Sequence, residues 1–150
     1  MANVLVQNGS SEILLLQRAS RLVHPYVWGL PGGMIDEGET ALRAGMRELR
    51  EETGIVEGSL ALAGVRRFLI ETPREDIRVT NIHALSWRHE IPVILNPDEH
   101  IAYKWVSETD IYGSSDLLPG SPTMIASTLH DNFEIVDLTV YNDICITSLK

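Results

Sequence analysis

The sequence contains only one cysteine, Cys145, and no long apolar run. A single thiol cannot close a disulfide within the chain, and it excludes cysteine pairs of zinc-finger spacing. A membrane-spanning helix needs about 18 or more consecutive apolar residues, which this chain lacks. Residues 1–7 also lack the basic segment and long apolar core of a secretory signal peptide. We therefore expect a cytoplasmic protein with no membrane segment.

Positive charge is scarce as well. Lysine and arginine total 12 against 21 aspartates and glutamates, which gives a formal net charge of −9. This balance disfavours electrostatic capture of nucleic acid or of an anionic membrane surface. If the protein binds a polyanionic ligand, another source of positive charge has to be present.

The length and composition are those of one soluble globular domain. A chain of 150 residues is too short for two well-packed cores, and 44% apolar and 22% charged residues are close to average. We find no internal repeat, low-complexity segment or linker. The prediction is therefore a single domain over residues 1–150.

Hydrophobic periodicity predicts more strands than helices. Strands are expected at residues 4–6, 13–17, 59–70, 77–89 and 101–106. Helices are expected from Thr40 to Gly54, briefly after Ser107, and over residues 121–130. Glycines and prolines predict an irregular loop over residues 28–33. This mixed order indicates an α+β fold, arranged as an α/β/α sandwich.

The last segment, residues 133–149, is rich in isoleucine, valine, threonine and tyrosine. This composition predicts a terminal β-hairpin. An exposed strand of this kind can pair with another chain, so self-association as a homodimer is a further expectation.

Three carboxylates lie on one side of the longest expected helix. At about 100° per residue, Glu48, Glu51 and Glu52 share an arc of roughly 100°. Like charges three or four positions apart destabilise a helix. Two interpretations are open. One is a solvated acidic face, partly neutralised by Arg47 and Arg50, and the other is a site for a hard cation such as Mg²⁺ or Mn²⁺.

The segment GMIDEGETALRAGMRELREETGI resembles the complete signature of the Nudix hydrolase family. The positions that match the family's spacing are Gly33, Glu39, Arg47, Glu48, Leu49, Glu51, Glu52, Gly54 and Ile55. Residues 28–32 before it and 105–107 late in the chain also resemble the family. The resemblance implies a mixed β-sheet between helices, with the signature segment forming the floor of a cleft.

The resemblance also implies roles for residues of this segment. The implied ligands of Mg²⁺ or Mn²⁺ are Glu48, Glu51, Glu52 and the carbonyl of Gly33. Arg47 is implied to pair with Glu39 and with one of the metal-binding glutamates, which orients the ligands. A metal ion would also supply the positive charge that an acidic protein needs to bind a polyphosphate.

The implied reaction is hydrolysis of a nucleoside diphosphate linked to another group, X. Water attacks one phosphorus of the diphosphate bridge while a carboxylate accepts its proton. The candidates for this base are Glu51, Glu48 and Glu99. The identity of X stays open among nucleoside triphosphates, nucleotide sugars including ADP-ribose, and dinucleoside polyphosphates.

A second segment, residues 99–105, resembles part of the bacterial dihydroneopterin triphosphate pyrophosphohydrolases. His100 and Tyr103 within it could contact a substrate. On an alternating strand, however, core packing is the expected role of Tyr103. Neither residue is assigned to the site.

A different class of function is a sensor that binds a nucleotide on the same fold without cleaving it. Such a module is expected to lose the metal-binding glutamates, and this sequence retains all of them. An RNA 5′-end pyrophosphohydrolase is disfavoured, because the chain carries a net charge of −9 and no basic run. Catalysis on a small nucleotide is therefore the leading expectation.

Overall fold

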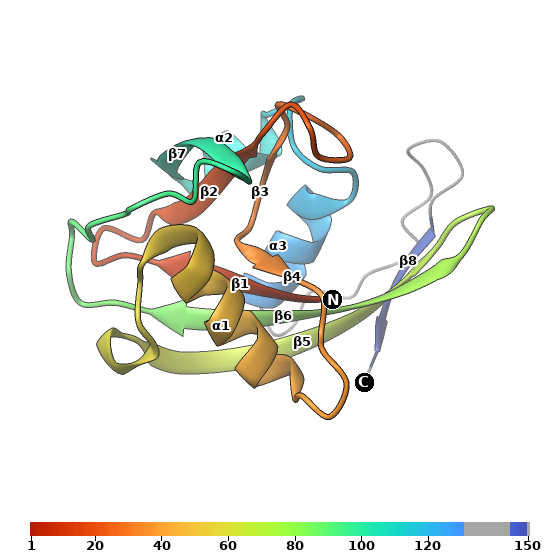
Figure 1. The fold of residues 1–150 in the computed structure, drawn as a ribbon, viewed down its shortest axis with the longest axis horizontal. Helices are drawn as coiled ribbons and strands as arrows, with labels where there is room; N and C mark the ends of the chain where they lie inside the picture. Colours follow the sequence, from red (N-terminus) through yellow and green to blue (C-terminus); the bar gives the residue numbers. More distant parts are fainter. Residues whose placement is uncertain (131–144, 150) are drawn as a thin grey trace.

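In the computed structural model, which describes residues 1–130 and 145–149, eight strands form one sheet (Figure 1). The strands are β1 (Ala2–Gln7), β2 (Ile13–Arg18), β3 (Trp28–Gly29), β4 (Gly32–Gly33), β5 (Ala61–Glu71), β6 (Asp76–Leu85), β7 (His100–Val106) and β8 (Cys145–Leu149). The helices are α1 (Ala41–Thr53), α2 (Glu108–Tyr112) and α3 (Ser121–Leu129), with a 3₁₀ turn, η1, at Glu57–Ser59.

The sheet is mixed. Its main path runs β3-β2-β1-β6-β5-β8, with β4 added beside β1 and β7 beside β2. Strand β6 lies parallel to β1, whereas the other strand pairs are antiparallel. Helix α1 covers one face of the sheet and α3 the other (Figure 1). The predicted mixed sheet between helices is confirmed.

The central strands are buried on both faces, which explains their nearly continuous apolar sequences. On β1, Val4 and Val6 join the core cluster under α1, and Leu5 joins the cluster on the opposite face. Strand β2 repeats this division, with Leu14 and Leu16 toward α1. Side chains alternate between the two faces because successive residues of a strand point in opposite directions.

Helix α1 begins and ends where the sequence predicts. The Thr40 hydroxyl accepts a hydrogen bond from the Arg43 amide at 3.2 Å, which caps the first turn. Gly54 ends the helix in the left-handed region, at a φ of 72°, and its amide donates to the Arg50 carbonyl at 2.9 Å. Leu49 is fully buried against the sheet. The caps and the apolar stripe together fix which side of α1 faces the sheet.

Two predicted elements need correction. Residues 28–33 are not wholly irregular, because Trp28–Gly29 pairs with β2 and Gly32–Gly33 pairs with β1. The strand predicted over residues 77–89 ends at Leu85, since its partner β1 ends at Gln7. Beyond that point the chain follows the β1–β2 turn, where the Gly9 amide donates to the Arg88 carbonyl at 2.7 Å.

The terminal hairpin can be judged only in part. Its last strand, β8, pairs antiparallel with β5, while residues 133–144 lie outside the described part of the chain. Self-association through this segment, and a single domain over residues 1–150, therefore stay predictions. No helix within residues 1–130 or the other described positions is long and apolar enough to cross a membrane.

Candidate active site

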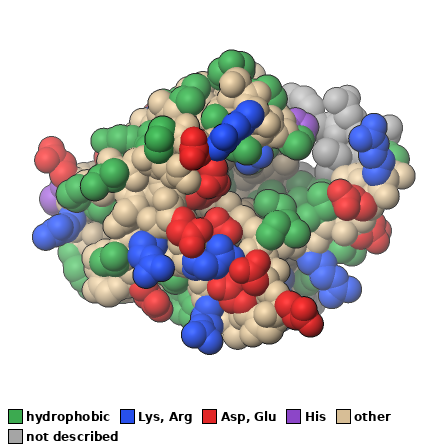
Figure 2. Space-filling model, in the orientation of Figure 1, with side chains coloured by type: hydrophobic (Ala, Val, Ile, Leu, Met, Phe, Trp, Pro, Cys, Tyr) green, Lys and Arg blue, Asp and Glu red, His purple; other side chains and the backbone are tan. Residues whose placement is uncertain are grey.

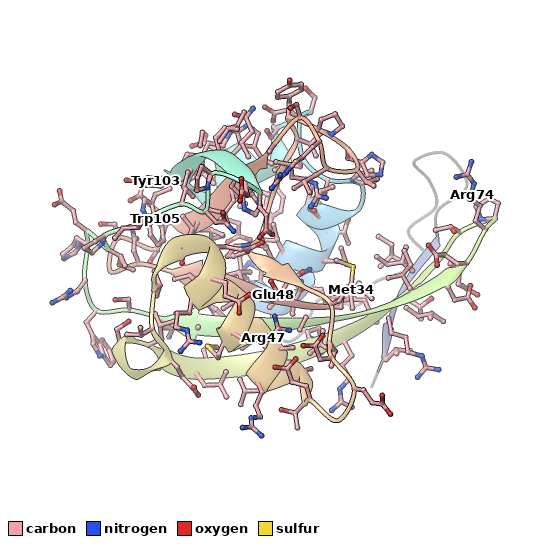
Figure 3. All side chains as sticks on the ribbon, viewed as in Figure 1. Met34, Arg47, Glu48, Arg74, Tyr103 and Trp105 are labelled. Carbon is pink, nitrogen blue, oxygen red and sulfur yellow. The ribbon has the colours of Figure 1, made fainter. Side chains whose placement is uncertain are left out.

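The signature segment places β4 against α1, so that Gly33 meets Glu48. A Cβ added to Gly33 would lie 2.4 Å from Glu48 Oε1 and 2.5 Å from its Cδ, much closer than atoms that are not bonded can approach. Only glycine allows the backbone and the carboxylate to lie this close. Figure 3 shows Glu48 on α1 facing the strand that leads into Met34. The carboxylate is therefore held at the backbone of the preceding loop.

Arg47 ties this loop to the helix. Its Nε and Nη2 donate to the two carboxylate oxygens of Glu39 at 3.1 and 3.0 Å, and its Nη1 donates to Glu48 Oε1 at 2.8 Å. Nη2 also donates to the Met34 carbonyl at 3.0 Å. The hydrogen bond from Arg47 holds the pKa of Glu39 below its ordinary value. The pairing of Arg47 with Glu39 and a glutamate of the helix is present as predicted, while its role in orienting ligands stays a prediction.

Glu52 is the buried member of the acidic group. Its side chain is only 4% exposed, and its Oε2 accepts a hydrogen bond from the Gly32 amide at 2.9 Å. Burial raises the pKa of Glu52 to about 8, and the charges of Glu48 and Glu99 act in the same direction. A solvated acidic face is therefore excluded for Glu52. Its carboxylate needs a cation to be stable as an anion at this depth.

The third glutamate, Glu51, differs from the other two. Its side chain is 50% exposed, and its Oε2 lies 3.6 Å from Arg47 Nη1. Glu48 thus faces Arg47, Glu52 faces the Gly32 amide, and Glu51 is half open to solvent. Among the residues that the structure describes, no three His, Cys, Asp or Glu side chains converge closely enough to hold a metal ion as they stand. The metal site stays a prediction.

The donor set nevertheless fits a hard divalent cation. Glu48, Glu51 and Glu52 supply carboxylate oxygens from adjacent turns of one helix, and the backbone of Gly33 lies against the first of them. Oxygen ligands of this kind suit Mg²⁺ and Mn²⁺. Acidic and basic side chains also gather near the centre of the face on which α1 lies (Figure 2). The buried charge of Glu52 is the feature that a cation would compensate.

Glu99 comes from a separate loop that is fastened to the same helix. Its Oε1 accepts a hydrogen bond from Asn96 Nδ2 at 2.8 Å, and its carbonyl accepts one from the Ala19 amide at 2.8 Å. The Asn96 amide donates in turn to the Glu52 carbonyl at 3.1 Å. The loop before β7 therefore holds Glu99 beside the buried glutamate, and the charge of Glu99 is felt at Glu52.

His100 is a residue of this region that the sequence did not assign. Its side chain is 5% exposed, and its Nδ1 lies 3.8 Å from Glu52 Oε1. Burial lowers the pKa of His100 to about 4, with the charge of Arg18 acting in the same direction. The signal in the sequence was its place in the segment 99–105, which led us to consider it for substrate contact and not for a position beside Glu52. Gly32, which holds Glu52, lies in the family-like segment 28–32, whereas Asn96, which holds Glu99, carried no signal beyond its place in a loop.

Several other basic and aromatic residues do not join this group. Arg74 is at the tip of the β5–β6 connection, well separated from Glu48 in Figure 3. Phe68 is fully buried in a core cluster with α3, and Trp28 is stacked under Lys104, whose Nζ lies 4.1 Å from the ring centre. Tyr103 is exposed on β7, so the core packing expected for it is wrong. The site is therefore built from the signature segment and the loop before β7.

Comparison with known proteins gives consistent results. A sequence profile described as the NUDIX domain matches residues 1–127. The chain is 36% identical over 103 residues to the asymmetrical bis(5'-nucleosyl)-tetraphosphatase of Mus musculus, covering 67% of each protein. It is 49% identical over 53 residues to an m7GpppN-mRNA hydrolase of Xenopus laevis, covering 35% of this chain but only 18% of that protein. The solved structure of a MutT protein from Methanosarcina mazei superposes with a TM-score of 0.71 and 27% identity, covering 89% of this chain and 94% of that one.

Proposed function

This chain belongs to the Nudix family of hydrolases, which act on phosphoanhydride bonds, and we propose that it is a Mg²⁺- or Mn²⁺-dependent pyrophosphohydrolase of small nucleotides. The observation that carries the proposal is the buried carboxylate of Glu52, fixed by the Gly32 amide beside the charges of Glu48 and Glu99. A non-catalytic binding module has no need of such a costly arrangement.

In this proposal the residues of α1 hold the cation and the loop shapes its surroundings. Glu48, Glu51, Glu52 and the carbonyl of Gly33 are the proposed ligands. A bound divalent cation neutralises the non-bridging phosphate oxygens and polarises the bond that is cleaved. Arg47 contacts protein groups on the helix and loop, so its proposed task is to keep Glu48 in place.

The proton of the attacking water needs a carboxylate acceptor. Arg47 donates to Glu48 at 2.8 Å, which makes Glu48 the weakest of the three candidates for the base. Glu51 is half exposed, and Glu99 is held by Asn96 with one oxygen engaged. We therefore place Glu51 and Glu99 first. Comparing the pH dependence of kcat for Glu51→Gln and Glu99→Gln distinguishes them, because loss of the base removes the acidic limb of the profile.

For the substrate we place dinucleoside polyphosphates first. The similarity to the mouse tetraphosphatase extends over two thirds of both chains, further than the similarity to the frog mRNA hydrolase. A net charge of −9 disfavours a long polyanionic RNA, whereas a small nucleotide can be held through a metal ion. Nucleoside triphosphates, nucleotide sugars and dihydroneopterin triphosphate are the alternatives.

The test is a panel of these compounds with Mg²⁺ or Mn²⁺, scored for nucleotide and phosphate release. Glu52→Gln serves as the blank, and Glu57→Gln, an exposed glutamate on η1, controls for loss of one charge. Cleavage of diadenosine tetraphosphate by wild type and Glu57→Gln alone supports the proposal and the substrate class. Cleavage of another compound class corrects the substrate. No cleavage of any compound overturns the proposal and favours the sensor.

A further inference from the structure

Two buried polar atoms in the described residues have no hydrogen-bond partner, His100 Nδ1 and Ser127 Oγ. A buried polar group left unpaired destabilises the fold. Ser127 lies on α3, on the opposite side of the sheet from α1. His100 faces the Glu52 carboxylate, with Nδ1 only 3.8 Å from Oε1, which is just beyond hydrogen-bond distance. Of these two atoms, His100 Nδ1 is therefore the one that faces a carboxylate of the candidate site.

A strand irregularity directs the imidazole to this position. Along most of the β2–β7 pair, consecutive residues face each other one to one, and Gln17 lies opposite Ala102. The register then shifts, so that Arg18 lies opposite His100 and Ile101 is skipped. A bulge of this kind re-aims one side chain of a strand. It brings His100 to the α1 side of the sheet and leaves Ile101 exposed.

The two oxygens of Glu52 are also unequal. Oε2 accepts the Gly32 amide at 2.9 Å, whereas Oε1 is the oxygen nearest His100. The backbone reinforces this relation, because the Asn96 amide donates to the Glu52 carbonyl and the His100 amide donates to the Asn96 carbonyl at 3.0 Å. Backbone hydrogen bonds therefore join the segments that carry the imidazole and the carboxylate. Nδ1 and Oε1 would have to approach by less than 1 Å to form a hydrogen bond.

We propose that His100 is a positioning residue for Glu52, donating from Nδ1 to Oε1 when the carboxylate is engaged by a metal ion. This inference rests on the proposed function, because it requires Glu52 to be a ligand. With Gly32 on one oxygen and His100 on the other, Glu52 is held in one orientation. Hydrogen bonds of this type to metal-binding carboxylates typically change metal affinity by about 10–100-fold when they are removed.

The experiment measures Mn²⁺ affinity without nucleotide, from the EPR signal of free Mn²⁺, together with the thermal midpoint of the metal-free protein. His100→Leu removes the donor and replaces the imidazole with an apolar side chain of similar size. His100→Asn keeps a donor, because its amide nitrogen stands as far along the side chain as Nδ1 does. Ser127→Ala, which removes the other unpaired buried group, is the matched control.

We expect His100→Leu to weaken Mn²⁺ binding by about 10–100-fold and to leave the metal-free thermal midpoint unchanged or raised. His100→Asn should recover most of the affinity, and Ser127→Ala should leave it unchanged. Wild-type affinity in His100→Leu, with binding lost in Glu52→Gln, overturns the positioning role alone. Weak binding in both His100 variants with a lowered metal-free midpoint also overturns it, since His100 would then serve only the fold. No Mn²⁺ binding by wild type overturns this proposal and the proposed metal site together.

Discussion

The guanidinium of Arg47 donates to both carboxylate oxygens of Glu39, at 3.1 and 3.0 Å, and so joins the loop before α1 to the helix itself. The same group donates to Glu48 at 2.8 Å. A planar fork can make these contacts at once, whereas a lysine ammonium is a single point on a flexible chain. The position of Glu48 thus depends on the shape of the arginine as well as on its charge.

Arg47→Lys tests this dependence. We expect kcat to fall by about 10–100-fold, as is typical when a group that orients metal ligands is changed. KM should change little, because Arg47 contacts protein groups. Steady-state kinetics on the cleaved nucleotide provides the measurement, with Arg50→Lys on the exposed side of α1 as the control. Equal kinetics for the two variants would show that charge alone suffices at position 47.

Gly33→Ala tests the contact between β4 and Glu48. The new Cβ would meet the end of the Glu48 side chain at 2.4 Å, and that flexible end can move away. We therefore expect a folded protein with a thermal midpoint near that of wild type and with activity reduced by an order of magnitude or more. Gly58→Ala, where a Cβ meets nothing within 4 Å, is the control. Full activity of Gly33→Ala would mean that the observed position of Glu48 is not needed for catalysis.

Glu52→Gln removes a charge and nearly preserves the shape of the side chain. We expect activity to fall by several orders of magnitude, because a proposed metal ligand is lost. The metal-free protein should remain folded and at least as stable as wild type, since a buried carboxylate is replaced by a neutral amide. Activity assays combined with urea denaturation distinguish loss of function from loss of fold. Near-normal turnover would show that α1 is not the metal helix.

The stability of the metal-free protein should depend on pH in a defined direction. The pKa of Glu52 rises on folding from 4.5 to about 8, so the folded state binds the extra proton and stability decreases as pH rises through this interval. The pKa of His100 falls from 6.5 to about 4, so its contribution increases with pH up to 6.5. The two effects oppose each other at lower pH, and only the Glu52 effect operates from 6.5 to 8.

We therefore expect the free energy of unfolding in EDTA to fall by about 1–2 kcal/mol between pH 6.5 and 8. Urea denaturation at several pH values gives this slope, and the difference from Glu52→Gln isolates it from other titrating groups. Saturating Mn²⁺ should reduce or reverse the fall, because a cation favours the ionised carboxylate. If the free energy of unfolding fell equally with pH in wild type and in Glu52→Gln, Glu52 would not be the group that titrates in this interval.

The sequence by itself determined the local elements and the chemical inventory of the site. Caps at Thr40 and Gly54 and a 3.6-residue apolar period act within a few residues, so the bounds of α1 could be predicted, and helix geometry placed Glu48, Glu51 and Glu52 on one arc. The signature spacing predicted the family, because a whole set of residue types recurs at fixed positions.

Only the tertiary structure decided which of these groups are buried and what they meet. A helical wheel gives the direction in which Glu52 points, but it does not predict the Gly32 amide that donates to its carboxylate. The parallel pairing of β1 with β6 likewise joins segments more than 70 residues apart. The alternation of β7 also could not place His100, since a bulge opposite Arg18 turns it toward α1. Burial, register and bulges arise from contacts between distant segments, and no local pattern of residues encodes them.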